Sequence, residues 1–144
     1  MSALTSTWPF WAILAAIFAA LTAILAKVGV SDINSNLATL IRTLVVLGVV
    51  FAIVWVRGEF SELPDVSRRS YVFLILSGIA TGASWLCYFK ALKLGPASQV
   101  APIDKLSIVL VVIFAAVFLG ERLTVSGWLG VVLIASGVVL VAVG

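Results

Sequence analysis

Five long apolar runs, at residues 8–29, 33–57, 70–92, 96–119 and 125–143, constrain this chain more than any other feature. A helix needs roughly 20 mostly apolar residues to cross a hydrocarbon core of about 30 Å, and runs of this length are not strands. With 63% hydrophobic and 10% charged residues, the chain cannot surround a water-soluble core with polar surface. We therefore predict an all-α integral membrane protein with five transmembrane helices, forming a single domain over residues 1–144.

The composition excludes several classes of chemistry. Histidine is absent and Cys87 is the only cysteine, which rules out Cys/His zinc sites, internal disulfides and histidine-dependent nucleophilic catalysis. The nine Lys/Arg and six Asp/Glu residues are scattered, so nucleic-acid binding has little support. No phosphate-binding GxxxxGK[ST] loop is present. We therefore expect no cofactor and no metal, and the lipid bilayer as the main partner.

The loop charges are almost balanced across the membrane. An odd number of spans places the two termini on opposite sides, here named side A for the N-terminus and side B for the C-terminus. Side A receives four positive loop charges, which are Arg57, Arg68, Arg69 and Arg122. Side B receives three, which are Lys27, Lys90 and Lys93. Orientation follows an excess of Lys/Arg on the cytoplasmic side. Insertion in both orientations and a single orientation with the Arg68–Arg69 loop in the cytoplasm are both open.

Three charged residues lie inside the predicted spans and are the leading site candidates. Arg42 lies in the second span, and Asp104 and Lys105 lie in the fourth. Each charge at a helix centre costs about 2.5–3.5 kcal/mol, so such residues face a protein interior or a water-filled cavity. Arg42 and Asp104 both lie roughly 12–14 Å from side B at 1.5 Å per residue. They can pair if the second and fourth spans are neighbours.

Uncharged polar residues concentrate in the same leaflet. They follow one face of each span, and we assign the following to a substrate site together with the three charges: Thr39, Ser84, Trp85, Tyr88 and Ser107. The opposite halves of the second and fourth spans are apolar, so one protomer contains half of a polar pathway. A second copy inserted upside down would supply the other half, as in transporters built from inverted repeats. Packing is the alternative role for Trp85.

Two further features concern the later spans. Pro102 lies two residues before Asp104, where it removes a backbone hydrogen bond and predicts a local interruption of the helix. A tolerated proline is the alternative. The fifth span carries Gly127, Gly130 and Gly137 on one face without charge, which favours helix packing or dimerisation.

The chain resembles, over essentially its whole length and most clearly over residues 78–140, the EamA domain of the drug/metabolite transporter superfamily. The resemblance rests on residues 85–92 (WLCYFKAL), the Gly95-Pro96-Ala97-Ser98 step, Pro102, residues 119–124 (LGERLT), Trp128, Gly130 and Gly137. It implies that most relatives contain two five-helix domains in inverted orientation and export amino acids, metabolites or drugs. This chain resembles the half-length members, which pair as homodimers. The resemblance also implies a structural role for Glu121 in the turn before the fifth span.

We therefore predict a multi-pass transporter of the cytoplasmic (inner) membrane that exports small polar or amphipathic metabolites by alternating access. It would work as an antiparallel homodimer of ten helices with dual topology. The charges Arg42, Lys105 and Asp104 favour a substrate with an anionic group, and Asp104 is a candidate for proton coupling. A membrane scaffold with a structural salt-bridge network is the main alternative. An intramembrane enzyme is disfavoured because histidine and paired carboxylates are missing.

Overall fold

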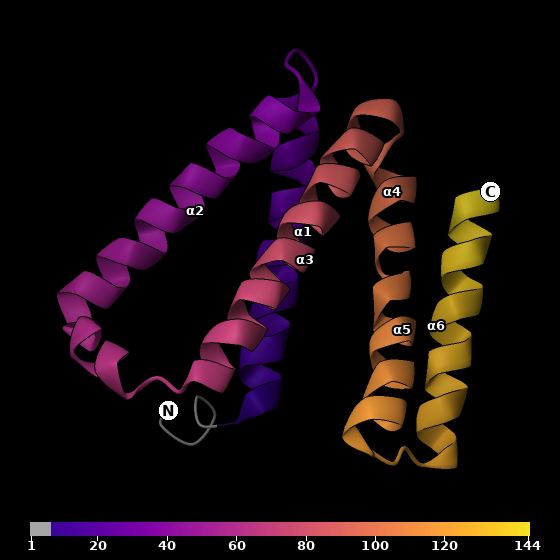
Figure 1. The fold of residues 1–144 in the computed structure, drawn as a ribbon. Coiled ribbons are helices and arrows are strands. Elements are labelled where there is room, and N and C mark those ends of the chain that lie inside the picture. Colours follow the sequence, from indigo (N-terminus) through magenta and orange to yellow (C-terminus); the bar gives the residue numbers. More distant parts are fainter. Residues whose placement is uncertain (1–6) are drawn as a thin grey trace. The chain divides into compact units, whose positions relative to one another are not determined.

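The computed structural model describes residues 7–144, which are helical apart from short connections (Figure 1). The helices follow one another as α1 (Trp8–Val30), α2 (Ser35–Arg57), the 3₁₀-helix η1 (Glu59–Asp65), α3 (Arg68–Leu94), α4 (Ala97–Asp104), α5 (Leu106–Phe114), the π-helix η2 (Ala115–Leu119) and α6 (Val125–Val143). No strand occurs in this part of the chain.

Within residues 7–144, five helices are long and apolar enough to cross a membrane, which agrees with the predicted number of spans. Four of them are α1, α2, α3 and α6, and the fifth is the continuous stretch Ala97–Leu119 formed by α4, α5 and η2. Most of their large apolar side chains are exposed, including Leu74, Leu133 and Phe118. Helices with apolar surface on this scale are suited to lipid or to a further membrane helix, not to water.

Capping residues determine where the helices begin. The Asn34 side chain accepts a hydrogen bond from the Asn36 N–H at 2.8 Å, so α2 begins at Ser35, two residues later than predicted. Ser67 Oγ accepts from the Ser70 N–H at 3.1 Å, and α3 accordingly begins at Arg68 instead of residue 70. The segment 58–69, predicted as a connecting turn, contains η1.

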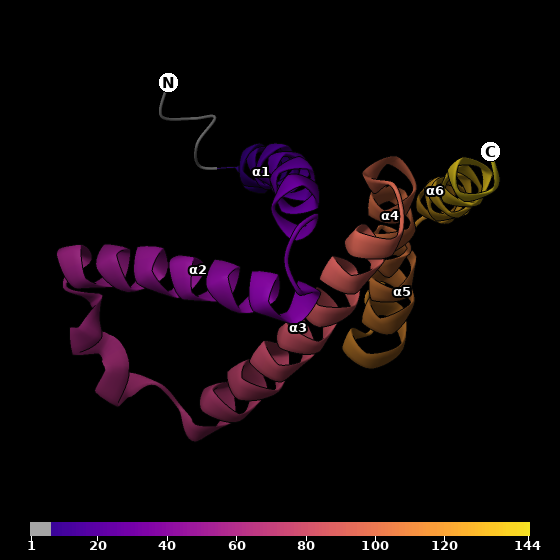
Figure 2. The ribbon, with the colours of Figure 1, turned by 90° about the horizontal axis from the view of Figure 1, so that it is seen from above.

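The chain divides into two compact units. One contains Ala26–Lys93, and the other contains the described residues up to Leu25 together with Leu94–Gly144. In the unit Ala26–Lys93, α2 and α3 diverge toward η1 in both views (Figures 1 and 2). Its buried apolar side chains gather at the opposite end, and they are Ala26, Val30, Ala38, Phe89 and Leu92. The prediction of a single domain over the whole chain stays a prediction.

Two lysines join the helix ends at this buried end. Lys27 Nζ donates a hydrogen bond to the Leu92 carbonyl at 2.6 Å, and Lys93 Nζ donates to the Ile33 carbonyl in the turn before α2. The last carbonyls of a helix have no intrahelical donor, and the Lys27 amine supplies one to the Leu92 carbonyl near the end of α3. The two bonds connect the end of α1, the start of α2 and the end of α3.

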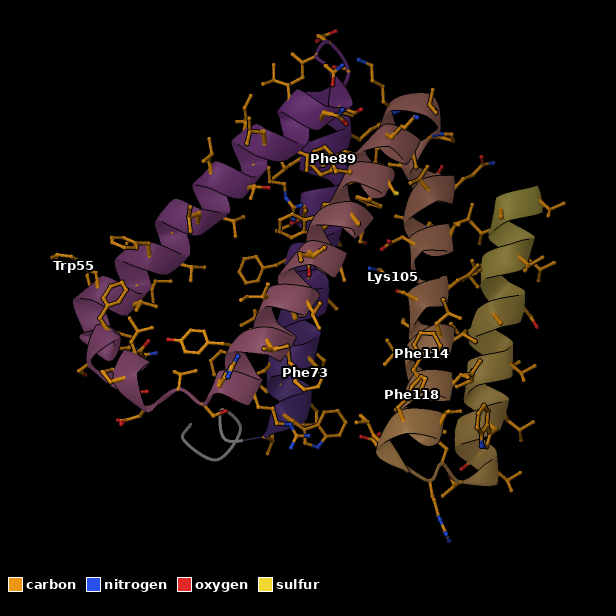
Figure 3. All side chains as sticks on the ribbon, viewed as in Figure 1. Trp55, Phe73, Phe89, Lys105, Phe114 and Phe118 are labelled. Atoms are coloured by element: carbon orange, nitrogen blue, oxygen red, sulfur yellow. The ribbon has the colours of Figure 1, made fainter. Side chains whose placement is uncertain are left out.

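In the other unit, α6 packs along both α4 and α5 (Figures 1 and 2). Val131 and Val138 are its buried residues, two turns apart on one face. At the far end of α5, the Phe114 and Phe118 rings lie 5.9 Å apart, and Figure 3 shows both on this stretch of chain. The Thr124 hydroxyl caps α6 by accepting from the Gly127 N–H at 3.2 Å.

Gly58 provides a test of the connection between α2 and η1. Its φ of +70° lies in the left-handed region, where a Cβ costs about 1–2 kcal/mol. We expect Gly58→Ala to lower the thermal unfolding temperature in detergent. The matched control is Gly48→Ala within α2, where nothing lies within 4 Å of an added Cβ. That change should be neutral or stabilising by up to about 1 kcal/mol, and equal losses in the two variants would contradict the prediction.

Candidate functional site

The Arg42 guanidinium is held by aromatic rings within the span. Its central carbon lies 4.1 Å from the centroid of the Trp85 ring and 5.6 Å from that of Phe89. Trp85 and Phe89 are four residues apart, so both project from one face of α3. A cation over an aromatic face within about 6 Å of its centroid is attracted by the ring quadrupole. The contact joins two residues that the sequence assigned to one substrate site, and their role in binding substrate stays a prediction.

Phe89 is the residue of this site that the sequence analysis missed. It is 3% exposed, and Figure 3 labels its ring on α3. Tyr88 stands next to it, with ring centroids 6.4 Å apart and the planes at 71°. The i, i+4 spacing of Trp85 and Phe89 was the signal that could have identified it.

The neighbouring hydroxyl groups are largely committed to the backbone. Thr39 is buried, and its Oγ1 donates to the Ser35 carbonyl at 2.9 Å. Thr43 Oγ1 donates to the Thr39 carbonyl at 2.7 Å. Such bonds to the preceding turn are the usual way for Thr to satisfy its hydroxyl in a membrane helix. Ser84 is exposed on α3, and its predicted role in binding stays a prediction.

The second cluster lies where the fourth span is interrupted. Lys105 has φ −71° and ψ −6° and separates α4 from α5, and its N–H donates to the Pro102 carbonyl at 2.9 Å. Pro102 has no N–H, so the Ser98 carbonyl lacks its normal i+4 donor. The interruption predicted from Pro102 is thus present, and it coincides with the charged pair. Figure 3 shows Lys105 at this point between the two helices.

Asp104 and Lys105 pair with each other. Lys105 Nζ lies 3.2 Å from Asp104 Oδ2, with 52% of the Lys105 and 35% of the Asp104 side chain exposed. Ser107 follows on the exposed surface of α5. Arg42 belongs to the unit Ala26–Lys93 and Asp104 to the other unit, so the predicted Arg42–Asp104 pair stays a prediction.

The remaining predicted residues lie on and before α6. A Cβ added to Gly127 would lie 3.1 Å from Leu123 Cδ2, whereas nothing lies within 4 Å at Gly130 or Gly137. Their role in dimerisation stays a prediction. At the end of η2, Gly120 adopts φ +69° and the main-chain N–H of Glu121 donates to the Ala115 carbonyl at 3.2 Å. The Glu121 side chain is exposed, and its structural role also stays a prediction.

Fold and site together define a multi-pass membrane protein with charged residues inside its spans. Residues 6–143 match the EamA-like transporter family, and the chain belongs to that family. The resemblance inferred from the sequence over essentially the whole chain is therefore confirmed. Membership of this family points to a membrane transporter, not to an enzyme.

Three curated relatives illustrate the family. A Sinorhizobium protein described as an uncharacterized transporter in the cobO 3′ region is 58% identical over 97% of this chain and 99% of its own length. The uncharacterized transporter YxxF of Bacillus subtilis is 30% identical over 92% of this chain but only 42% of its own length. A Hamiltonella defensa protein described as a probable 4-amino-4-deoxy-L-arabinose-phosphoundecaprenol flippase subunit, ArnE, is 29% identical over 56% of this chain and 72% of its own length. No solved structure matches the chain.

Proposed function

We propose that this protein exports small polar or amphipathic metabolites across the cytoplasmic (inner) membrane as a secondary transporter. The observation that carries the proposal is Arg42, a cation placed inside a membrane helix and held against Trp85 and Phe89. An ionisable residue in a span is expensive and is normally kept for a substrate or ion pathway. Family membership supports transport as the use of that pathway.

Alternating access in an antiparallel homodimer is the mechanism that we propose. The loop charges are nearly balanced, which permits both orientations. The Bacillus subtilis relative extends well beyond the region it shares with this chain, as expected if its remaining length supplied a second repeat. Two copies of this chain in opposite orientations would then correspond to one longer relative. Cysteine labelling should find the C-terminus on both sides of the membrane, and a single orientation would overturn this mechanism.

The transport proposal has a direct test. Purified protein is screened by thermal shift against amino acids, amphipathic drugs and lipid-linked sugar phosphates, the last chosen because of the name of the Hamiltonella relative. Compounds that stabilise the protein are then measured for flux in proteoliposomes. A protein that binds compounds but moves none of them would support the scaffold alternative, in which the charged residues are purely structural.

Proton coupling through Asp104 is a separate part of the proposal. Among the charged groups near this carboxylate, Lys105 is in direct contact with it at 3.2 Å. We expect flux to depend on a pH gradient, and Asp104→Asn, which cannot release a proton, to remove that dependence while leaving downhill flux measurable. Asp65→Asn, which changes an exposed carboxylate in η1 outside the spans, is the matched control and should keep it. Proton coupling through Asp104 would be contradicted if wild-type flux did not depend on the pH gradient, or if the flux of Asp104→Asn depended on it as the wild type does.

A further inference from the structure

We infer that the Arg42 site binds the anionic end of the substrate, a carboxylate or a phosphate monoester, and this inference rests on the proposed transport function. The prediction from sequence relied on a combined count of Arg42, Asp104 and Lys105. In the structure Asp104 and Lys105 are already in contact at 3.2 Å, so that pair contributes little net charge. The structural case for an anion therefore depends on Arg42 alone.

No carboxylate on the helices that carry this site can neutralise Arg42. Neither α2 nor α3 contains Asp or Glu. In the same unit, Glu59 pairs with Arg57 at 3.4 Å, beyond the C-terminal end of α2. Arg42 lies about 10 Å from the other end of that helix at 1.5 Å per residue. The aromatic rings stabilise the cation but carry no negative charge, so α2 and α3 leave the counter-charge of Arg42 to a group outside these two helices, and we assign that place to an anionic group of a substrate.

The ring contacts also leave the hydrogen-bonding capacity of Arg42 in place. A cation over an aromatic face is attracted through its charge, whereas the N–H donors of a guanidinium lie in its plane. Five such donors form a rigid fork that matches a carboxylate or a phosphate with two parallel hydrogen bonds. Trp85 and Phe89 thus hold the charge in position, and these ring contacts themselves use none of the donors that a bidentate ligand needs.

Charge at the nearest end of the unit favours the approach of an anion. Three lysines lie at this end, and they are Lys27, Lys90 and Lys93. Asp32 is the acidic residue beside them, while Glu59, Glu62 and Asp65 lie in η1 beyond the opposite end of α2. Clustered charge of one sign raises the local concentration of the opposite ion. An anion would meet a net positive rim on this side and Arg42 deeper in the span.

The experiment compares acids with neutral molecules of similar shape. Protein in phosphatidylcholine nanodiscs is titrated with benzoate and benzamide, with phenyl phosphate and benzyl alcohol, and with farnesyl phosphate and farnesol. Thermal shift and calorimetry report binding. We expect at least one acid to bind and its neutral partner to bind about 10- to 100-fold more weakly. Tightest binding of farnesyl phosphate would identify the substrate as a lipid phosphate. Tightest binding of benzoate or phenyl phosphate would identify it as a soluble anion.

Three variants test whether Arg42 causes the preference for acids over their neutral partners. Arg42→Gln should weaken the acid about 10- to 100-fold and remove its advantage over the neutral partner. Arg42→Lys should retain part of that advantage because it keeps the charge but loses the fork. Arg57→Gln also removes one positive charge, but from an exposed position at the end of α2, and should bind as the wild type does. Equal binding of acids and neutral partners, or equal losses in Arg42→Gln and Arg57→Gln, would overturn the inference.

Failure of the inference can be separated from failure of the proposed function. Selective acid binding that depends on Arg42, without flux of any compound in proteoliposomes, would support the anion site and contradict transport. Flux of neutral or cationic compounds that persists in Arg42→Gln would support transport and contradict the anion site.

Discussion

Arg42→Gln is expected to reduce substrate flux in proteoliposomes by roughly 100-fold while the protein remains folded. Two charge-assisted hydrogen bonds to a substrate account for a loss of this size. Stability should not fall in parallel, because a charge at a helix centre costs about 2.5–3.5 kcal/mol and its cation–π contacts offset only about 0.5–2 kcal/mol. Flux is measured with the compounds found in the thermal-shift screen, and the unfolding temperature is measured on the same preparations.

Arg57→Gln is the control for this change. It removes the same charge from the same helix, outside the membrane-embedded site, where Arg57 pairs with the exposed Glu59. Exposed pairs of this kind contribute about 0–1 kcal/mol, so flux should stay near that of the wild type. The prediction is wrong if Arg42→Gln transports normally. If the wild type transports and a folded Arg42→Gln variant does not, the scaffold alternative is also excluded, because a scaffold would show no flux in either protein.

The double variant Gly130→Leu/Gly137→Leu is expected to abolish dimers and to lower flux at least tenfold. Nothing lies within 4 Å of a Cβ at either position, so the protomer has room at both sites. Both glycines precede a buried valine by one residue, which places them 100° around α6 from the face that packs on α4 and α5. In a dimer that packs through these glycines a larger side chain would overlap the second copy, and overpacking costs about 1–3 kcal/mol.

Gly48→Leu is the matched control for the dimer. Gly48 lies in α2 and also has nothing within 4 Å of an added Cβ, but it is outside the proposed dimer face. Cross-linking in membranes and the mass of the purified complex measure the dimer, and the unfolding temperature measures folding. Dimers that persist in the double variant, or that are lost equally in Gly48→Leu, would exclude α6 as the interface.

The spans were predictable because the length of an apolar run is a strong signal. The fifth, predicted at 125–143, coincides with α6. The errors occur at polar residues, where side-chain caps such as Asn34 and Ser67 determine the first helical residue. Sequence periodicity also could not reveal η1, because Pro64 and three acidic residues between apolar runs are typical of an irregular loop.

The site was predictable from its charges and less so from its apolar members. Arg42 was identified because a charged residue in an apolar span is costly, and Trp85 because of its depth. Phe89 was missed because an apolar side chain in a membrane helix is not unusual by itself, and only its i, i+4 spacing from Trp85 relates it to the site. The contact between adjacent Asp104 and Lys105 belongs to the structural salt-bridge alternative, although neighbouring residues point about 100° apart on a regular helix. The interruption of the helix at Lys105 removes that constraint.

The lysines at the ends of α1 and α3 have a consequence for experiments that reverse membrane orientation. Lys27 and Lys93 donate to the Leu92 and Ile33 carbonyls, and these bonds can form only after all three helices have been inserted. Both residues also belong to the loop charges from which orientation is predicted. If those charges set the orientation, removing either lysine would alter the orientation signal and the folded structure together. Lys90, which is exposed on α3, is the better position for shifting orientation alone.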